Sequence, residues 1–330
     1  MSVETRGRAP RGASSRRPAG PGRPGYEAGA NGDARARQRD RVMRTAIATA
    51  NDYVSLTKPR IISLLLLTTV ATMFVADPGG PPLSTVLWTM LGGYLAAGGA
   101  GAINHYLERE SDAHMARTRG RPLASGRISP ARGLTFGAGL GLVATIQLAL
   151  TVNVLAAALA LSGLLGYVFV YTLWLKPRTP QNIVLGGAAG AIPPLVGWAA
   201  ATGELSAQAL WPFAIVFLWT PPHFWALSLL IAEDYAKTGT PMLPVVRGEV
   251  ATRHQILVYA VALVAISLGP VATGLFGGFY LAAALLLGAG FVGLAVALNR
   301  DPSRRAARRL YLSSLAYLAL LFVAMAIDRA

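Results

Sequence analysis

Long apolar stretches, separated by short polar segments, fill the chain from about residue 52 to its C-terminus. Each stretch is close to the roughly 20 residues that a helix needs to cross about 30 Å of hydrocarbon. The pattern therefore predicts an all-α, polytopic membrane protein. Nine transmembrane helices are expected near residues 60–76, 85–107, 131–150, 153–174, 183–201, 209–231, 255–275, 279–298 and 310–327.

The charges of the connecting segments test this count independently. If the N-terminus is cytoplasmic, every inner segment contains Lys or Arg, and these segments are 108–130, 175–182, 232–254 and 299–309. The outer segments contain neither residue, and they are 77–84, 151–152, 202–208 and 276–278. Only Arg329 falls outside. Because Lys and Arg concentrate in cytoplasmic loops, the alternation predicts an odd number of helices, a cytoplasmic N-terminus and an external C-terminus.

The N-terminal part of the chain has a different composition. Residues 1–50 are rich in Arg, Gly, Pro and Ala, so we expect a disordered, basic cytoplasmic tail that contacts anionic lipid, followed by a transmembrane domain over residues 51–330. The whole chain is 53% hydrophobic, has a net charge of +15 and contains no cysteine. The tail and inner loops explain the charge without nucleic acid, and the lack of cysteine excludes thiol chemistry.

The segment after the second predicted helix carries the strongest chemical signal. Asn104, Glu108 and Asp112 recur at every fourth residue, which places them on one face of a continuing helix. Arginines follow at positions 117, 119 and 121. Amide and carboxylate oxygens suit Mg²⁺ and guanidinium groups suit phosphate, so this segment can hold a metal ion and a polyanion together. The alternative is a solvated loop at the membrane edge.

A second acidic segment follows the sixth predicted helix. Residues 232–237 contain Glu233, Asp234 and Lys237, and four helices separate them from the first acidic segment. The spacing indicates a four-helix pseudo-repeat with one extra helix. Both segments are expected on the same side of the membrane, where they can converge on one site and clamp a diphosphate through two Mg²⁺ ions. An ordinary loop with a local Asp–Lys pair is the alternative.

Further candidates lie around the helix ends. Lys176 and Arg178, and on weaker grounds Lys58 and Arg60, are either phosphate contacts or membrane-edge anchors. Asn182 is expected to cap the fifth helix.

Aromatic residues and one histidine lie within the predicted helices. His223 either contacts a substrate such as haem, or satisfies carbonyls freed by the two prolines before it. Aromatic side chains can face a cationic intermediate, although packing explains each of them equally well; they are Tyr167, Tyr171, Trp174, Phe224 and Trp225.

The first acidic segment resembles the leading motif of the UbiA superfamily of intramembrane prenyltransferases. The matching residues are Asn104, Glu108, Asp112, Met115, Arg117, Thr118, Arg121 and Gly126. Two positions differ from the usual motif: Glu108 stands where Asp is more usual, and Ser111 stands where an apolar or larger residue is usual. Neither difference removes a metal ligand. Three longer stretches, 171–200, 217–229 and 234–259, resemble the protohaem IX farnesyltransferase branch of that superfamily.

The resemblance implies a UbiA-type helix bundle and a reaction. The farnesyl group of farnesyl diphosphate would pass to a vinyl group of haem B with addition of water, giving haem O and diphosphate. Mg²⁺ would be the cofactor, and a haem A synthase would be a partner in making the haem of cytochrome oxidase. The acidic residues in the tail favour a bacterial cell membrane over an organelle membrane.

The resemblance also implies roles for individual residues. The residues assigned to metal and diphosphate binding are Asn104, Glu108, Asp112 and Asp234, the last three as metal ligands. The residues assigned to diphosphate contact are Arg117, Arg121, Lys176 and Arg178, and His223 is assigned to haem.

Three other functions compete with this interpretation. Prenylation of an aromatic acid in quinone synthesis would use the same fold, although the long stretches resemble the haem branch. A transporter would suit His223 and helices broken by proline, although the acids cluster at one membrane face rather than midway. An inactive assembly factor would require the acidic segments to be inert.

Overall fold

The structure, a computed structural model, describes residues 26–329, and within them every regular element is a helix. Contacts divide the chain into two compact units, Met1–Thr49 and Ala50–Ala330. Helix α1, Tyr26–Thr57, occupies the second half of the stretch in which we expected disorder. Residues 34–50 contain neither Gly nor Pro and are mostly Ala, Arg and other good helix formers, which explains this difference. Residues 1–25 lie outside the described part.

Nine helical segments in the described residues are long and apolar enough to cross a membrane, which confirms the predicted all-α, nine-span architecture. Six spans are single helices: α2 Pro59–Ala76, α3 Leu83–Leu107, α5 Pro130–Thr151, α11 Leu243–Ala272, α12 Gly278–Arg300 and α13 Arg304–Arg329. Three spans combine two elements: α6 Val154–Leu165 with η1 Gly166–Leu175, α7 Asn182–Gly190 with α8 Ile192–Thr202, and η2 Ala207–Ala209 with α9 Leu210–Leu230.

The inner ends of two spans differ from the prediction. Helix α11 begins at Leu243 rather than near residue 255. Its first residues form a short helix of their own, which non-helical Gly248, with a φ of 77°, separates from the long helix that follows. Pro244 suits the first turn of this helix, which needs no backbone donor there. Helix α13 begins at Arg304 rather than near residue 310, because its arginine-rich first turns are polar but still favour helix.

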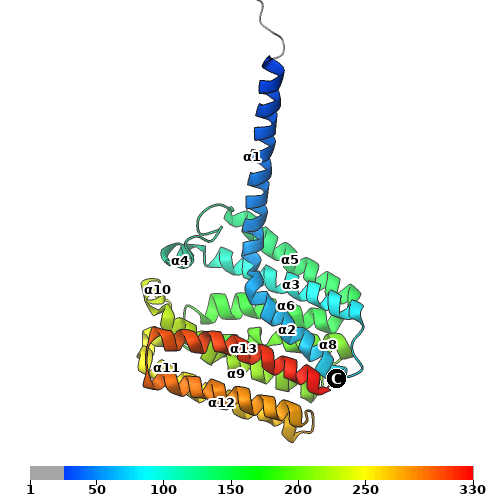
Figure 1. The fold of residues 1–330 in the computed structure, drawn as a ribbon, viewed down its shortest axis with the longest axis vertical. Helices are drawn as coiled ribbons and strands as arrows, with labels where there is room; N and C mark the ends of the chain where they lie inside the picture. Colours follow the sequence, from blue (N-terminus) through cyan, green and yellow to red (C-terminus); the bar gives the residue numbers. More distant parts are fainter. Residues whose placement is uncertain (1–25, 330) are drawn as a thin grey trace, which may run out of the picture. The chain divides into compact units, whose positions relative to one another are not determined.

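Two short helices lie in segments that were expected to be loops. Helix α4, Arg109–His114, follows α3, and helix α10, Ala232–Lys237, follows α9. Each has acidic residues in its first turn. Figure 1 shows both at the same end of the bundle, away from the C-terminus. A span followed by a short acidic helix thus occurs twice, as the proposed pseudo-repeat requires.

Small residues bring α3 and α5 into backbone contact. A Cβ atom added to Gly99 would lie 2.7 Å from the carbonyl oxygen of Gly137, and one added to Gly137 would lie 2.8 Å from Ile103. Such close approach is typical of membrane helices, which pack through small residues rather than through exclusion of water. The contact fixes the inner half of α3, which leads directly to the acidic segment.

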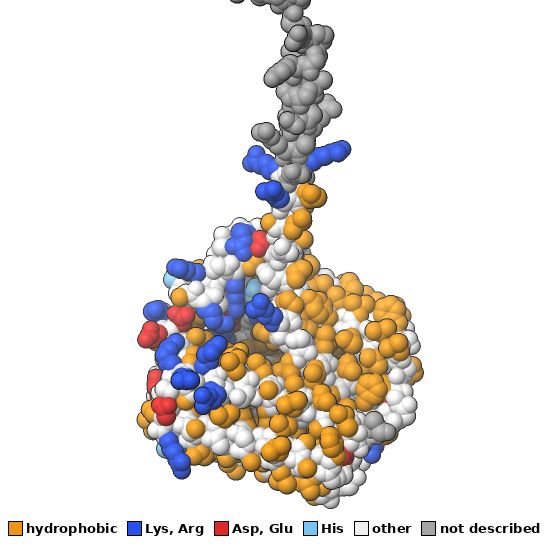
Figure 2. Space-filling model, in the orientation of Figure 1, with side chains coloured by type: hydrophobic (Ala, Val, Ile, Leu, Met, Phe, Trp, Pro, Cys, Tyr) orange, Lys and Arg blue, Asp and Glu red, His pale blue; other side chains and the backbone are white. Residues whose placement is uncertain are grey.

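The surface of the bundle separates apolar from charged areas. Figure 2 shows a largely apolar face with charged side chains gathered at the side where α4 and α10 lie. Leu150 and Leu286 are 81% and 76% exposed, which suits contact with lipid rather than water. The nine apolar spans and this surface belong to an integral membrane protein.

Candidate functional site

The end of α3 and the start of α4 bring the three predicted oxygen ligands together. Helix α3 ends at Leu107, Glu108 is its C-cap, and α4 resumes at Arg109. The side chains of Asn104 and Asp112 are buried, and Glu108 is partly buried. The helical spacing expected from the sequence is therefore kept across a short break, and the three polar groups lie inside the protein rather than in water.

Each of these three side chains is held by a cation from another part of the chain. Lys58 Nζ donates to Asn104 Oδ1 at 2.7 Å. Lys176 Nζ pairs with Glu108 Oε1. Arg121 Nη1 pairs with Asp112 Oδ2 at 2.7 Å. The solvated loop that we considered as an alternative does not describe this arrangement, because buried charges persist only when they are paired.

The π-helix η1 places two of the polar partners. Thr172 Oγ1 donates to the carbonyl of Tyr167, and the backbone N–H of Lys176 donates to the carbonyl of Tyr171, both five residues back. Asn104 Nδ2 then donates to Thr172 Oγ1 at 3.3 Å. The wider turn of a π-helix rotates residues off the α-helical register, and such turns are frequent at functional sites. The apolar pattern of this segment did not signal it, so sequence reasoning missed Thr172.

The loop after α4 is tied down at both ends. Thr118 Oγ1 donates to the carbonyl of Asp112 at 3.0 Å. Arg127 forms an ion pair with Asp52 at 3.0 Å. Gly126 has a φ of 76°, a left-handed conformation that suits glycine. These contacts hold Arg121 against Asp112.

Burial and charge shift the pKa values of groups at this membrane edge. Burial alone would raise the pKa of the Glu108 carboxyl, but the charge and hydrogen bond of Lys176 hold it below its usual range. Burial lowers the pKa of Lys58 to about 7, and the nearby Arg121 adds to this effect. Glu108 therefore stays ionised, whereas the ammonium group of Lys58 lacks a sufficient counter-charge.

The second acidic segment approaches the first. Tyr235 of α10 and Met115 belong to one buried cluster. Burial raises the pKa of the Tyr235 phenol, and its charged neighbours include Arg117, which lowers the pKa, and Glu108, which raises it. Asp234 lies 3.9 Å from Lys237, the local pair that we considered as an alternative. Among residues 26–329, no three His, Asp or Glu side chains form a ready-made metal cage.

Three other candidates do not lie among these pairs. Arg178 is exposed and donates to the carbonyls of Leu173 and Trp174. Asn182 does not cap its helix; Gln181 holds that position, and the Asn182 side chain instead donates to a carbonyl in the preceding turn. Arg117 is exposed, and only its charge reaches the site.

His223 lies in the core between α9 and α13. Its ring stacks on Trp219 and Tyr311 at centroid distances of 4.2 and 4.9 Å. Its Nδ1 shares a hydrogen bond of 2.6 Å with Ser314 Oγ, so the role of satisfying carbonyls freed by the prolines is not the one observed.

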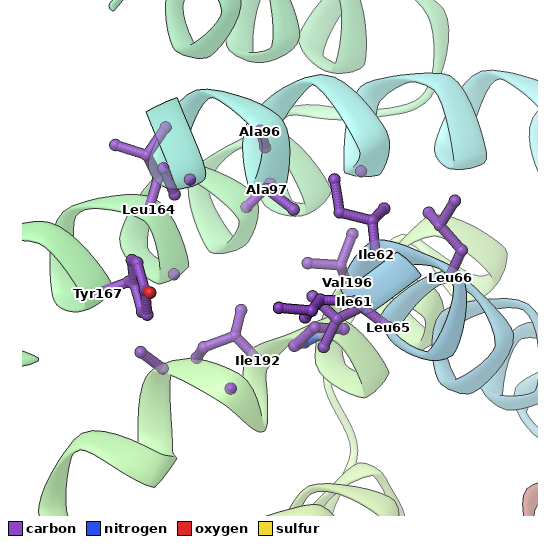
Figure 3. Close-up of a pocket in the computed structure, with 18 of the residues that line it drawn as sticks. Ile61, Ile62, Leu65, Leu66, Ala96, Ala97, Leu164, Tyr167, Ile192 and Val196 are labelled. Atoms are coloured by element: carbon purple, nitrogen blue, oxygen red, sulfur yellow. The ribbon is translucent and has the colours of Figure 1, made fainter. Parts of the chain in front are cut away.

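An apolar cavity of about 240 Å³ lies beside the charged pairs. Its walls come from the last residue of α1 and from α2, α3, α6, η1, α7 and α8. Figure 3 shows Tyr167 and Leu66 at opposite sides of it. Lys58 is the only charged residue that lines it. Of the five aromatic candidates, only Tyr167 lines this cavity, with its ring stacked on Tyr171. Trp174 is 58% exposed, and Trp225 is buried in the core.

The chain is similar to known proteins over most of its length. The model of the UbiA prenyltransferase family matches residues 65–323. A protein of Symbiobacterium thermophilum called protoheme IX farnesyltransferase is 51% identical over 295 residues, which make up 89% of this chain and 98% of that protein. A protein of Roseiflexus sp. with the same name is 54% identical over 84% of this chain, but the chain spans only 52% of that protein. The chain also spans only about half the length of other curated relatives that it matches.

Solved structures share the fold. One comes from structural work on digeranylgeranylglyceryl phosphate synthase in membranes. It has a TM-score of 0.68 and 16% identity, and the match covers 85% of this chain and 98% of that chain. A UbiA homolog from Archaeoglobus fulgidus bound to GPP and Mg²⁺ has a TM-score of 0.60 and 14% identity over 83% of this chain and 99% of its own. At such low identity these likenesses establish the fold and nothing finer.

Proposed function

The chain belongs to the UbiA prenyltransferase family, and on this premise we propose that it transfers the farnesyl group of farnesyl diphosphate to haem B. One observation carries the proposal: an apolar cavity adjoins a partly buried set of cations and oxygen ligands, and Lys58 belongs to both. A prenyl diphosphate has the matching form, an apolar chain joined to a polyanion. The choice of farnesyl donor and haem acceptor rests on the names of relatives that are 51% and 54% identical.

Mg²⁺ fits the donors at this site. Asp112 keeps one carboxylate oxygen without a partner in the described part of the chain, although its side chain is only 4% exposed. Mg²⁺ needs no closed cage, because it usually takes about one or two carboxylates together with phosphate oxygens. Glu108, Asp112 and Asp234 would hold the ion, with Asn104 beside them. When bound, Mg²⁺ would neutralise the charge of the departing diphosphate.

The protein's own side chains would perform the remaining tasks. Arg121 and Lys176 would turn from their carboxylates to the diphosphate, with Arg117 at the rim. The C1–O bond of the farnesyl group would break, and its electron pair would leave with the diphosphate. The cavity would keep water from the resulting allylic cation. A vinyl carbon of haem B would then form the new bond, and water would add to the second cation and lose a proton.

His223 is our proposed haem contact. Its Nδ1 is engaged by Ser314, and its Nε2 has no hydrogen-bond partner among the described residues. Because the hydrogen bond at Nδ1 orients the ring and leaves Nε2 free, Nε2 suits an axial ligand of haem iron. His223 does not line the cavity, which suits a haem that approaches from a second direction.

We also propose the membrane and the orientation. The basic residues near α4, α10 and the first turn of α13 favour the cytoplasmic side for this end of the bundle, and hence an external C-terminus. A bacterial cell membrane is the expected location. Haem O leaving this site would be the substrate of a haem A synthase.

Mass spectrometry of extracted haem tests the function. Purified protein would be incubated with haem B, farnesyl diphosphate and Mg²⁺, with EDTA and Asp112→Ala as controls. We expect a haem that has gained a farnesyl group and water, absent from both controls, while Asp112→Ala still inserts into the membrane. Prenylation of an aromatic acid in a parallel tube, without haem product, would refute the acceptor. No product from folded protein in either tube would refute the proposed activity.

A further inference from the structure

Of the three cations that hold Asn104, Glu108 and Asp112, Lys58 alone touches no carboxylate among the described residues. Arg121 pairs with Asp112 and Lys176 pairs with Glu108, whereas the one hydrogen bond of the Lys58 ammonium group within the described part of the chain goes to the neutral amide of Asn104. Its Nζ also lies 6.0 Å from the centre of the Tyr167 ring. Three cations thus face two carboxylates, which leaves one positive charge without a counter-charge. A cluster of this kind favours an anionic ligand.

The position of Lys58 says which part of a ligand it would meet. It is the only charged residue of the apolar cavity, and its ammonium group donates to Asn104, the first of the three oxygen ligands at the end of α3. An amphiphile whose chain fills the cavity therefore has its first polar group beside Lys58. Resting on the proposed function, we propose that Lys58 binds the phosphate group next to the prenyl chain, while Arg121 and Lys176 serve the distal phosphate.

The backbone of Lys58 supports a role for its side chain. Its φ of 58° and ψ of 55° are left-handed, and it is the only residue other than glycine with positive φ in the described part of the chain. This conformation costs a residue with a Cβ atom more than it costs glycine. Strained residues of this kind cluster at ligand sites, where the surrounding fold holds them in place. Lys58 adopts this conformation at the junction between the end of α1 and the start of α2.

A phospholipid headgroup shares the phosphate chemistry, and its acyl chain could enter the same cavity. The diphosphate is the better match, because Arg121 and Lys176 supply partners for a second phosphate next to the first. A phosphodiester would leave both without a new partner. The two sources are separated by competition with anionic lipid.

Ligand binding without haem tests the proposal. Dissociation constants for farnesyl diphosphate, inorganic diphosphate and farnesol would be measured by calorimetry in nanodiscs of neutral lipid. Lys58→Met should weaken farnesyl diphosphate and inorganic diphosphate binding by about 10- to 100-fold, as expected for one charge-assisted hydrogen bond, and leave farnesol binding unchanged. Arg60→Met is the matched control. Arg60 is exposed and lies two residues from Lys58, and its substitution removes the same charge.

A second variant separates binding from folding. Lys58→Gly should lose as much affinity as Lys58→Met, yet melt at a higher temperature than Lys58→Met, because glycine relieves the positive φ. Diphosphate affinities that are equal in wild type and both variants would overturn the proposal, as would an equal loss of farnesol affinity. It would also be overturned if Lys58→Met weakened the binding of anionic lipid more than the binding of diphosphate. A wild-type protein that binds neither diphosphate would overturn the proposed function as well.

Discussion

Lys176→Met removes the partner of Glu108 without disturbing the apolar part of the side chain. Methionine retains most of the length and volume of lysine but has no charge. Glu108 would remain within the protein, since its side chain is 15% exposed and that of Lys176 is 19% exposed. The carboxylate would then be buried beside helix α3 with its main counter-charge gone.

The cost follows from the burial of the pair. Removing one partner of a buried ion pair destabilises a protein by about 3–5 kcal/mol, because the other charge is left uncompensated. Glu108 can protonate and Lys58 and Arg121 still act on it, so we expect the lower end, about 3 kcal/mol. For a domain of this size class, about 2–4 °C per kcal/mol converts this to a fall in the melting temperature of about 6–12 °C.

Thermal unfolding in one detergent would measure this effect through a double-mutant cycle. Glu108→Gln combined with Lys176→Met should recover most of the lost stability, because neither charge remains, and all three variants should lose turnover. Arg178→Met is the control, since Arg178 is exposed and contacts only carbonyls. A double variant that melts no higher than Lys176→Met, or a single variant that melts like wild type, would refute the buried pair.

Three further predictions concern packing, specificity and pH. Gly99→Ala should destabilise the protein by about 1–3 kcal/mol in thermal unfolding, because its Cβ would meet the Gly137 carbonyl oxygen at 2.7 Å, whereas Gly139→Ala, which meets nothing within 4 Å, should not. Ala97→Phe should fill the cavity and, in competition assays, shift the preferred donor from farnesyl diphosphate to dimethylallyl diphosphate. An unchanged preference would show that the prenyl chain binds elsewhere. Because burial lowers the pKa of Lys58 from 10.5 to about 7, the unfolded state binds more protons between these values. Stability should therefore rise with pH across this window relative to Lys58→Met, and a constant difference would refute the shift.

The spans were largely predictable because their signal is local. Hydropathy and loop charge located nine helices, and the family resemblance in the acidic motif and the longer stretches is confirmed by the family match. The errors lie where helices continue into polar sequence. Leu243 and Arg304 begin their helices before hydropathy rises, since helix formation requires only compatible backbones and not apolar side chains. Helix α4 continues the helix expected through Asp112 after a short break at Glu108, which the sequence did not indicate.

The site was predictable only as far as its contacts are close in sequence. The ion pair of Arg121 with Asp112 joins residues nine apart within one motif, and both were candidates. Lys176 and Glu108 are 68 residues apart, so the sequence could name each of them but could not pair them. Their pairing depends on the π-helix η1, whose extra residue per turn left no trace in the apolar pattern.

Lys58 shows why some functional evidence has to be tertiary. In the sequence it is one of two basic residues before a membrane helix, a place where anchoring to the interface explains any lysine. What distinguishes it from Arg60 is a contact with Asn104, 46 residues away, a cavity lined by several helices and a left-handed backbone. None of these has a local signature. Charge counting in the folded site, where each carboxylate already has a cation, is what singles out Lys58 as the residue that lacks an anion.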